Sequence, residues 1–201
     1  MFTGIVSDIG TVVARQAGVF TIRSRYDAAG IALGASIACD GCCLTVTSVR
    51  SEGQGSIFSV DVSNETLSKT TLGRWQAGHP INLERALKAA DELGGHIVSG
   101  HIDGVALIAD MHADGDSRRF TIEVPAEFAR YIAAKGSVAL AGTSLTVNAV
   151  DGRCFGVNLI PHTLTETTWG SRKPGDSVNL EVDLFARYVE RMLGFRVLEQ
   201  G

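Results

Sequence analysis

The sequence Gly41-Cys42-Cys43-Leu44-Thr45-Val46 recurs, about 100 positions later, as Gly142-Thr143-Ser144-Leu145-Thr146-Val147. Matches this dense continue over about 90 positions and indicate an internal duplication. Downstream blocks match in the same order: Thr66-Leu67 with Thr163-Leu164, Gly73 with Gly170, Gly78 with Gly175, and Asn82-Leu83-Glu84 with Asn179-Leu180-Glu181. The chain is therefore predicted to contain one fold twice.

The duplication divides the chain into three parts. Residues 1–95 form the first copy, residues 96–183 the second, and residues 184–201 a tail that has no counterpart in the first copy. Each copy lies near the lower end of domain sizes, so each can fold as a unit. Two copies are too few for a solenoid, which needs at least three repeats.

Each copy contains six short stretches that are typical of strands, separated by glycine-bearing turns. Six short strands in a small domain predict an antiparallel barrel or sandwich, and closing the sheet would remove its exposed edges. The expected strands are residues 10–14, 20–24, 36–39, 44–49, 57–62 and 80–85, then 104–109, 119–124, 137–140, 145–150, 154–159 and 177–182.

Few segments are typical of helices. Residues 125–136 begin with proline and end with glycine, which predicts a helix, and residues 66–72 and 163–169 predict short helical turns. Residues 184–193 form an amphipathic helix, for which two interpretations stay open: packing onto its own barrel, or self-association. Its apolar face would carry Leu184, Phe185, Tyr188, Val189, Met192 and Leu193.

Composition excludes several classes of protein. The 201 residues carry 18 basic and 22 acidic side chains, without a basic run, which argues against a nucleic-acid partner. No apolar stretch approaches the length of a membrane span, and the first residues lack the features of a secretory signal, so we expect a cytoplasmic protein. Disulfides are not expected there, and Cys39-x-x-Cys42 lacks a second pair that would complete a zinc site.

Familiar catalytic motifs are absent, so the differences between the copies are the best guide to chemistry. Cys43 matches Ser144; a small core residue is favoured over a nucleophile. His101 matches Ile5 and is a candidate for acid–base work, because histidine is the side chain most often used to transfer protons in catalysis. His96 is interpreted as a structural hydrogen-bonding residue. The Gly-x-x-Leu-Thr-Val turns could hold a planar polar ring through backbone groups, or simply close a β-turn.

Taken together, several motifs resemble the riboflavin synthase family of the alpha-chain type over nearly the whole chain. They are Met1-Phe2-Thr3-Gly4-Ile5-Val6, Gly41-Cys42-Cys43-Leu44-Thr45-Val46, Glu65-Thr66-Leu67, Gly94-Gly95-His96-x-x-Ser99-Gly100-His101 and Thr163-Leu164-x-x-Thr167. The resemblance implies an all-β protein: two tandem six-stranded Greek-key β-barrels and a C-terminal α-helix that assembles a homotrimer. Lumazine-binding antenna proteins share this fold, so a non-catalytic lumazine- or flavin-binding protein is the alternative.

The same resemblance implies an activity. Two molecules of 6,7-dimethyl-8-ribityllumazine would dismutate, one giving a four-carbon unit to the other, to yield riboflavin and 5-amino-6-(ribitylamino)uracil. No metal and no external cofactor are expected, and association with lumazine synthase is a further expectation. The working site would join the first barrel of one chain to the second barrel of its neighbour. Many family members have aspartate where this chain has Ala141, whereas the first copy has Asp40.

Site residues carried over from the family fall into three sets. Candidate catalytic residues are Cys43, His101, Ser144, Ser36 and Thr146, and Phe2 is a further matching position that would bind substrate. The first pocket would be lined by Gly4, Ile5, Val6, Cys43, Leu44, Thr45, Asp61, Val62, Ser63, Asn64, Glu65 and Thr66. The second pocket would be lined by Gly100, His101, Ile102, Lys135, Ser144, Leu145, Thr146, Leu159, Ile160, Pro161, His162, Thr163 and Leu164.

Overall fold

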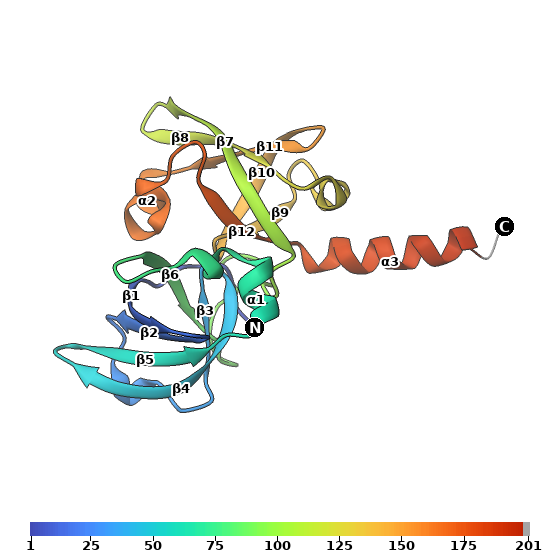
Figure 1. Ribbon diagram of the computed structural model, residues 1–201. Coiled ribbons are helices and arrows are strands. Elements are labelled where there is room, and N and C mark those ends of the chain that lie inside the picture. Colours follow the sequence, from blue (N-terminus) through green and yellow to red (C-terminus); the bar gives the residue numbers. More distant parts are fainter. Residues whose placement is uncertain (199–201) are drawn as a thin grey trace.

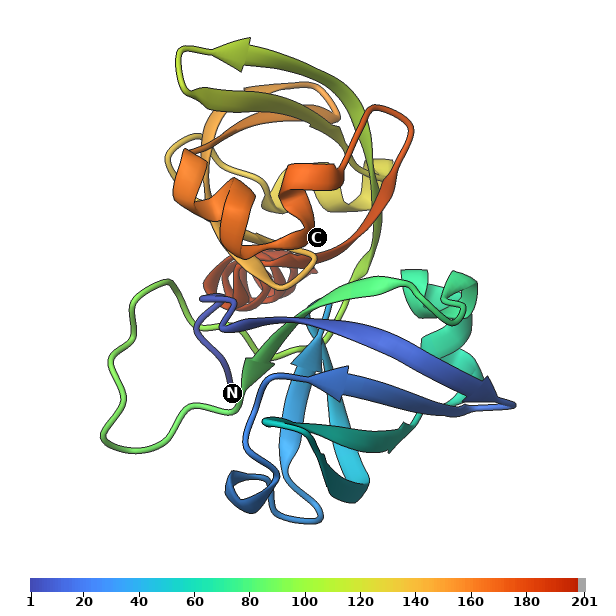
Figure 2. The ribbon, with the colours of Figure 1, turned by 90° about the vertical axis from the view of Figure 1, so that its left-hand side faces the viewer.

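The computed structural model, which describes residues 1–198, contains two closed six-stranded antiparallel barrels and a C-terminal helix that projects away from them (Figure 1). Strands of the first barrel neighbour one another in the order β1-β2-β5-β4-β3-β6, and the second barrel has the same cyclic order. A view turned by 90° shows one barrel above the other, with the linker between them as a wide loop at the side (Figure 2). The duplication predicted from the sequence is therefore confirmed as two barrels.

All twelve expected strands are present, several of them longer than predicted. The first barrel consists of β1 (Asp8–Gln16), β2 (Val19–Ser24), β3 (Ser36–Cys39), β4 (Cys42–Glu52), β5 (Gly55–Asp61) and β6 (Pro80–Arg85). The second consists of β7 (Gly104–Asp114), β8 (Ser117–Glu123), β9 (Ser137–Leu140), β10 (Thr143–Asp151), β11 (Cys154–Leu159) and β12 (Ser177–Val182).

Each barrel has its own apolar core, because side chains along each strand alternate between the interior and the outside. In β2, for example, Phe20 and Ile22 are buried while their neighbours face outward. A tryptophan fills each core: Trp75 packs edge-on against Phe20, and Trp169 against Phe120, with ring centroids 5.7 and 5.1 Å apart. Two separate cores agree with the size of the repeats.

The short helical turns lie where the sequence predicts them, each broken in two by a threonine. Helix α1 (Asn64–Lys69) is followed by the 3₁₀ helix η2 (Thr71–Arg74), and α2 (Pro161–Glu166) by η4 (Thr168–Ser171). Thr70 and Thr167 have extended backbones, and their hydroxyls accept the N–H groups of Leu72 and Trp169. These threonines end one helix and cap the next.

The helix predicted over residues 125–136 is wrong for half of its length. Only the 3₁₀ helix η3 (Ala126–Tyr131) forms, and Ile132 returns to an extended conformation. Ile132 is buried in the second core, and Phe128 and Tyr131 pack against it. Lys135, with φ +66°, then turns the chain into β9. Tertiary packing of these apolar side chains therefore overrides the proline and glycine signals.

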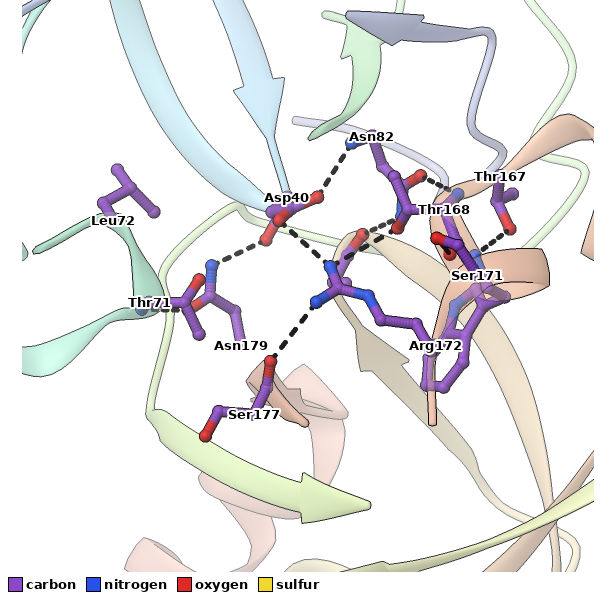
Figure 3. Close-up of polar contacts among 12 residues, drawn as sticks. Asp40, Thr71, Leu72, Asn82, Thr167, Thr168, Ser171, Arg172, Ser177 and Asn179 are labelled. Carbon is purple, nitrogen blue, oxygen red and sulfur yellow. Dashed lines mark hydrogen bonds and ion pairs between the residues drawn. The ribbon is translucent and has the colours of Figure 1, made fainter. Parts of the chain in front are cut away.

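The two barrels are joined by a reciprocal pair of asparagines (Figure 3). The Asn82 amide donates to the carbonyl of Ala141 at 2.9 Å and accepts the N–H of Thr168 at 2.8 Å. Asn179 does the same in reverse, donating to the carbonyl of Asp40 at 2.9 Å and accepting the N–H of Thr71 at 2.7 Å. All four bonds are buried, which gives the repeated asparagine a structural purpose.

One ionic contact at the junction belongs to only one copy. Asp40 accepts the N–H of Asn82 at 2.8 Å and lies 3.4 Å from the Arg172 guanidinium. The matching positions in the other copy are Ala141 and Trp75, so the carboxylate and its guanidinium partner are both replaced. Ala141, where many family members have aspartate, lies at the same junction, and its carbonyl accepts the Asn82 amide.

Burial raises the pKa of Asp40 to about 6, although Arg172 and the backbone N–H of Asn82 oppose the shift. The native state therefore holds a proton that the unfolded chain releases near pH 4. We expect the free energy of unfolding to fall, as pH rises from about 4 to about 6, by up to about 1.4 kcal/mol per pH unit relative to Asp40→Asn. Urea unfolding of both proteins at several pH values measures this, and a constant difference between them would contradict it.

Candidate active site

A segment at the start of each copy crosses to the other barrel. In the first copy, Glu84 at the end of β6 accepts the N–H and hydroxyl of Thr3, at 2.7 and 2.8 Å, and the N–H of Gly4 at 3.0 Å. The carbonyl of Gly4 then accepts the N–H of Ser144, on β10 of the second barrel, at 2.8 Å. Glu84 thus fixes a loop of its own barrel against the other.

The second copy repeats this arrangement. Glu181 on β12 accepts the N–H and hydroxyl of Ser99, and the N–H of Gly100 at 2.9 Å. The carbonyl of Gly100 accepts the N–H of Cys43, on β4 of the first barrel, at 2.8 Å. Burial raises the pKa of both Glu84 and Glu181, and the hydrogen bonds from these loops oppose that shift. The repeated Asn-Leu-Glu motif therefore serves the junction through asparagine and the crossing loops through glutamate.

Cys43 lines a cavity of about 480 Å³ between the first barrel and the loop of the second copy. Helix α1, capped by Ser63, contributes Glu65, Thr66 and Lys69. The remaining walls are Cys42, Thr70, Gly100, His101 and Ile102. A thiol, an imidazole, a carboxylate and an ammonium group thus surround one space, so this cavity can both hold a polar ring and move protons.

Gly100 is required at this place. Its φ is +81°, and a Cβ atom there would lie 2.5 Å from the Cβ of Cys43 and 3.0 Å from the ring of Phe2. Any larger residue would push the His101 loop away from Cys43.

Ser144 has a different neighbour from Cys43. Nδ1 of His96 lies 2.7 Å from the Ser144 hydroxyl, and burial lowers the pKa of this histidine, which favours the neutral imidazole. Nε2 of His96 is buried without a partner among the described residues. Gly95 allows the approach, since a Cβ atom there would lie 2.9 Å from that of Ser144. The sequence predicts that His96 makes a structural hydrogen bond. In the structure the partner in this bond is Ser144, a candidate catalytic residue.

The predicted division of residues between the two pockets is wrong. Gly4 belongs against Ser144 of the second barrel, and Gly100, His101 and Ile102 line the Cys43 cavity of the first. The reason is a short antiparallel bridge between Phe2 and Val98, which carries each segment across the junction. Ile5 is exposed beside the linker, 3.4 Å from the Cβ position of Gly94, and half-buried Val6 follows it before β1.

Several other predicted site residues lie outside the open cavity. Phe2 is fully buried between the barrels with Val98, Ala38 and Ala139, against which Cys43 packs. Leu44, Val62, Leu145 and Leu159 belong to the two barrel cores. Ser36 pairs with Thr45 across β3 and β4, and Lys135, at its positive φ, donates its N–H to Val147.

The remaining predicted site residues lie on or next to the short helices α1 and α2 and on the strands β5 and β10. Asp61 ends β5, Ser63 caps α1, and Asn64, Glu65 and Thr66 lie on α1. In the second copy, exposed Ile160 precedes α2, which carries Pro161, His162, Thr163 and Leu164, while Thr146 lies on the outer face of β10. Lys69, Thr70 and Cys42 also line the Cys43 cavity, although they are not among the site residues predicted from the sequence. Glu65 and Lys69 are four residues apart, which places both on one face of a helix, and this spacing could have identified Lys69.

The described residues give no support to a metal site, a disulfide or a membrane-spanning helix. Between residues 1 and 198, no group of three or more His, Cys, Asp or Glu side chains is arranged to hold a metal ion. Cys39 and Cys42 face each other across β3 and β4 as free, buried thiols. None of the helices described is long and apolar enough to span a membrane.

Helix α3 (Leu184–Leu198) touches the second barrel mainly through polar groups near its start. Arg187 pairs with Asp103 at 2.9 Å, and Glu190 pairs with Arg130 at 3.0 Å and accepts the hydroxyl of Tyr131. Five of the six side chains on its predicted apolar face are more than half exposed, whereas Leu184 is partly buried; the five are Phe185, Tyr188, Val189, Met192 and Leu193. The apolar face therefore does not pack onto the chain's own barrel.

Comparisons with known proteins agree with this architecture. The model of the Lumazine binding domain family matches residues 3–86 and 99–183. Riboflavin synthase of Brucella abortus is 50% identical over 201 residues, covering 98% of this chain and 100% of the relative. Riboflavin synthase of Mycobacterium tuberculosis is 44% identical over 200 residues, covering 96% and 98%.

Solved structures have the same fold. LumP complexed with riboflavin superimposes with a TM-score of 0.76 at 23% identity, covering 90% of this chain and 99% of that one. LumP complexed with 6,7-dimethyl-8-(1'-D-ribityl) lumazine gives 0.75 at 21% identity with the same coverage. Paired barrels with crossing loops thus define a protein built of two lumazine-binding domains. Within that class, the chain belongs to the riboflavin synthase family.

Proposed function

We propose that this enzyme converts two molecules of 6,7-dimethyl-8-ribityllumazine into riboflavin and 5-amino-6-(ribitylamino)uracil. One molecule loses a proton from its C7 methyl group, the other is activated by a nucleophile that adds to its ring, and a four-carbon unit passes between them. The full-length similarity to riboflavin synthases carries the proposal. The reaction is a transfer between two identical substrates and needs no metal or external cofactor.

Two similar binding places suit two copies of one substrate. We assign one lumazine to the Cys43 cavity and the other to the Ser144 side of the second barrel. Cys43 and His101 would assist proton movement or placement of the nucleophile. Ser144, held by His96, would anchor the second ring, with Thr146 beside it. Holding both rings face to face replaces an encounter by a reaction within a bound pair, which can lower the barrier by several kcal/mol.

The two places within one chain are separated by packed side chains. The segments that form the bridge between Phe2 and Val98 lie between the two places. Cys43 packs against these segments at Gly100 and Phe2. Ser144 packs against them at Gly4 and Gly95. Phe2 and Val98, which form the bridge, are fully buried. The two rings would therefore meet only between chains, first barrel to second barrel. The bare apolar face of α3 supports assembly into a homotrimer. Cytoplasmic residence, expected from the sequence pattern, and association with lumazine synthase, expected from the family, both remain expectations.

Incubation of the purified chain with 6,7-dimethyl-8-ribityllumazine alone tests the proposal. We expect riboflavin and the pyrimidine product to accumulate in equal amounts, without added metal or cofactor. The alternative function is lumazine or flavin binding without turnover, as an antenna protein would show. Tight binding of the lumazine with no riboflavin formed would favour that alternative.

Replacing Cys43 by serine tests the assignment of the first ring. The change keeps a small polar side chain beside Gly100 but removes the thiol, so we expect kcat to fall about tenfold or more with little change in KM. Cys154→Ser is the matched control, because Cys154 lies at the start of β11 in the second barrel and lines no part of the cavity. Equal losses in kcat and affinity would assign Cys43 to binding or packing instead.

A further inference from the structure

A second cavity, of about 290 Å³, lies between the two barrels and away from both Cys43 and Ser144. Its walls come from η2 and η4 and from the residues that lead into β6 and β12. They include Thr71, Arg74, Trp75 and His79 of the first copy, and Arg172 and Ser177 of the second. Figure 3 shows the side chains of Thr71, Arg172 and Ser177, three of the residues that line this cavity.

Two guanidinium groups from different barrels meet at this cavity. Arg74 donates to the Ser177 hydroxyl at 3.0 Å, and Arg172 donates to the carbonyl of the same residue at 3.5 Å. The charge of Arg172 also lowers the pKa of His79, in addition to the effect of burial. Of the two carboxylates nearby, Asp40 is 3.4 Å from Arg172, and Asp176, which lines the cavity, accepts the N–H of Lys173. Among the described residues no carboxylate pairs with Arg74, so the positive charge on this side of the cavity favours an anion.

Two buried polar groups in the cavity wall have no partner among the described residues. They are Nε1 of Trp75, a residue that is 1% exposed, and the hydroxyl of Thr71, which is 8% exposed. The other tryptophan differs, since Trp169 donates its Nε1 to the Thr143 hydroxyl at 3.1 Å. An unpaired buried donor is costly, so a native structure usually supplies an acceptor.

We propose that this cavity binds an oxyanion of the phosphate class. Such an ion presents acceptor oxygens on every side, which suits the guanidinium of Arg74, the outer N–H groups of Arg172 and the unpaired groups of Trp75 and Thr71. The site would be distinct from the proposed reaction, whose substrate and products carry no phosphate group. It would bridge both barrels, and binding would therefore stabilise their junction.

Calorimetric titration of the full chain with inorganic phosphate, at constant ionic strength in a phosphate-free buffer, tests the proposal. We expect saturable binding with one phosphate per chain, and an affinity reduced about tenfold or more by Arg74→Ala. Arg153→Ala is the control, because Arg153 is an exposed arginine paired with Glu123, and it should bind as the unchanged protein does. Trp75→Phe, which keeps an aromatic ring but removes Nε1, should also weaken binding.

A parallel titration with ribose 5-phosphate distinguishes the source of the anion. Binding of both ligands, with the same dependence on Arg74, supports a site open to phosphate esters. Binding of inorganic phosphate alone supports a site for the free ion. Absence of binding by both, or binding that Arg74→Ala and Trp75→Phe leave unchanged, would overturn the proposal. The lumazine conversion assay is independent of these titrations, so a failure of either proposal leaves the other intact.

Discussion

A chain that ends at Asp183 is expected to be monomeric and to form almost no riboflavin. Truncation removes α3, whose apolar face is bare and whose contacts with the second barrel are polar. Each barrel keeps its own core, so the remaining protein should fold. Because the two lumazine rings would then no longer be held together, we expect turnover to fall about a hundredfold or more.

Sedimentation and the conversion assay measure this effect together. A second variant, Met192→Glu with Leu193→Glu, keeps the length of α3 but charges its exposed apolar face, and should give the same result. Arg153→Ala provides a matched surface change, because Arg153 pairs with Glu123 and not with α3. A proven monomer with full activity would exclude a site shared between chains.

Gly142→Ala is expected to have the largest effect on stability. The turns that precede β4 and β10 touch: a Cβ atom on Gly142 would lie 2.7 Å from the backbone nitrogen of Gly41, and the reverse is equally close. Both glycines have positive φ, which costs an alanine about 1–2 kcal/mol by itself. The steric overlap between the barrels should raise the total to about 3 kcal/mol or more.

Gly152→Ala isolates the backbone contribution. Gly152 also has positive φ (+58°), but open space surrounds its Cβ position, so its substitution should cost only the conformational strain. Urea unfolding of the two variants gives the difference that arises from contact between the barrels. Equal losses of stability would contradict the close approach of the two turns.

The architecture could be read from the sequence because strand patterns and the duplication are local or repeated signals. Alternation such as that in β2 records which side chains face the core, and the second copy confirms each strand of the first. Residues that are typical of the ends of a single helix predicted its bounds less reliably. Pro125 and Gly136 are typical of helix ends, yet the burial of Ile132 sets the conformation between them.

The site was only partly predictable, since the sequence identifies residues but not which barrel they face. Cys43 and His101 were both expected at the site, but in different pockets, because the bridge between Phe2 and Val98 has no periodic signal. The contact between His96 and Ser144 also depends on this crossing. Likewise, the partner of Asp40 could not be known, since Arg172 comes from the other barrel.

Mixing two inactive variants tests the central claim, that first and second barrels of different chains complete one site. Thr66→Trp on α1 would fill the Cys43 cavity, and Thr163→Trp is the same change at the matching place on α2. After subunits are exchanged at equal amounts, about one quarter of the sites would combine an intact first barrel with an intact second barrel. We therefore predict that the mixture regains about a quarter of the unmodified activity. A mixture with no more activity than its two components would contradict the shared site.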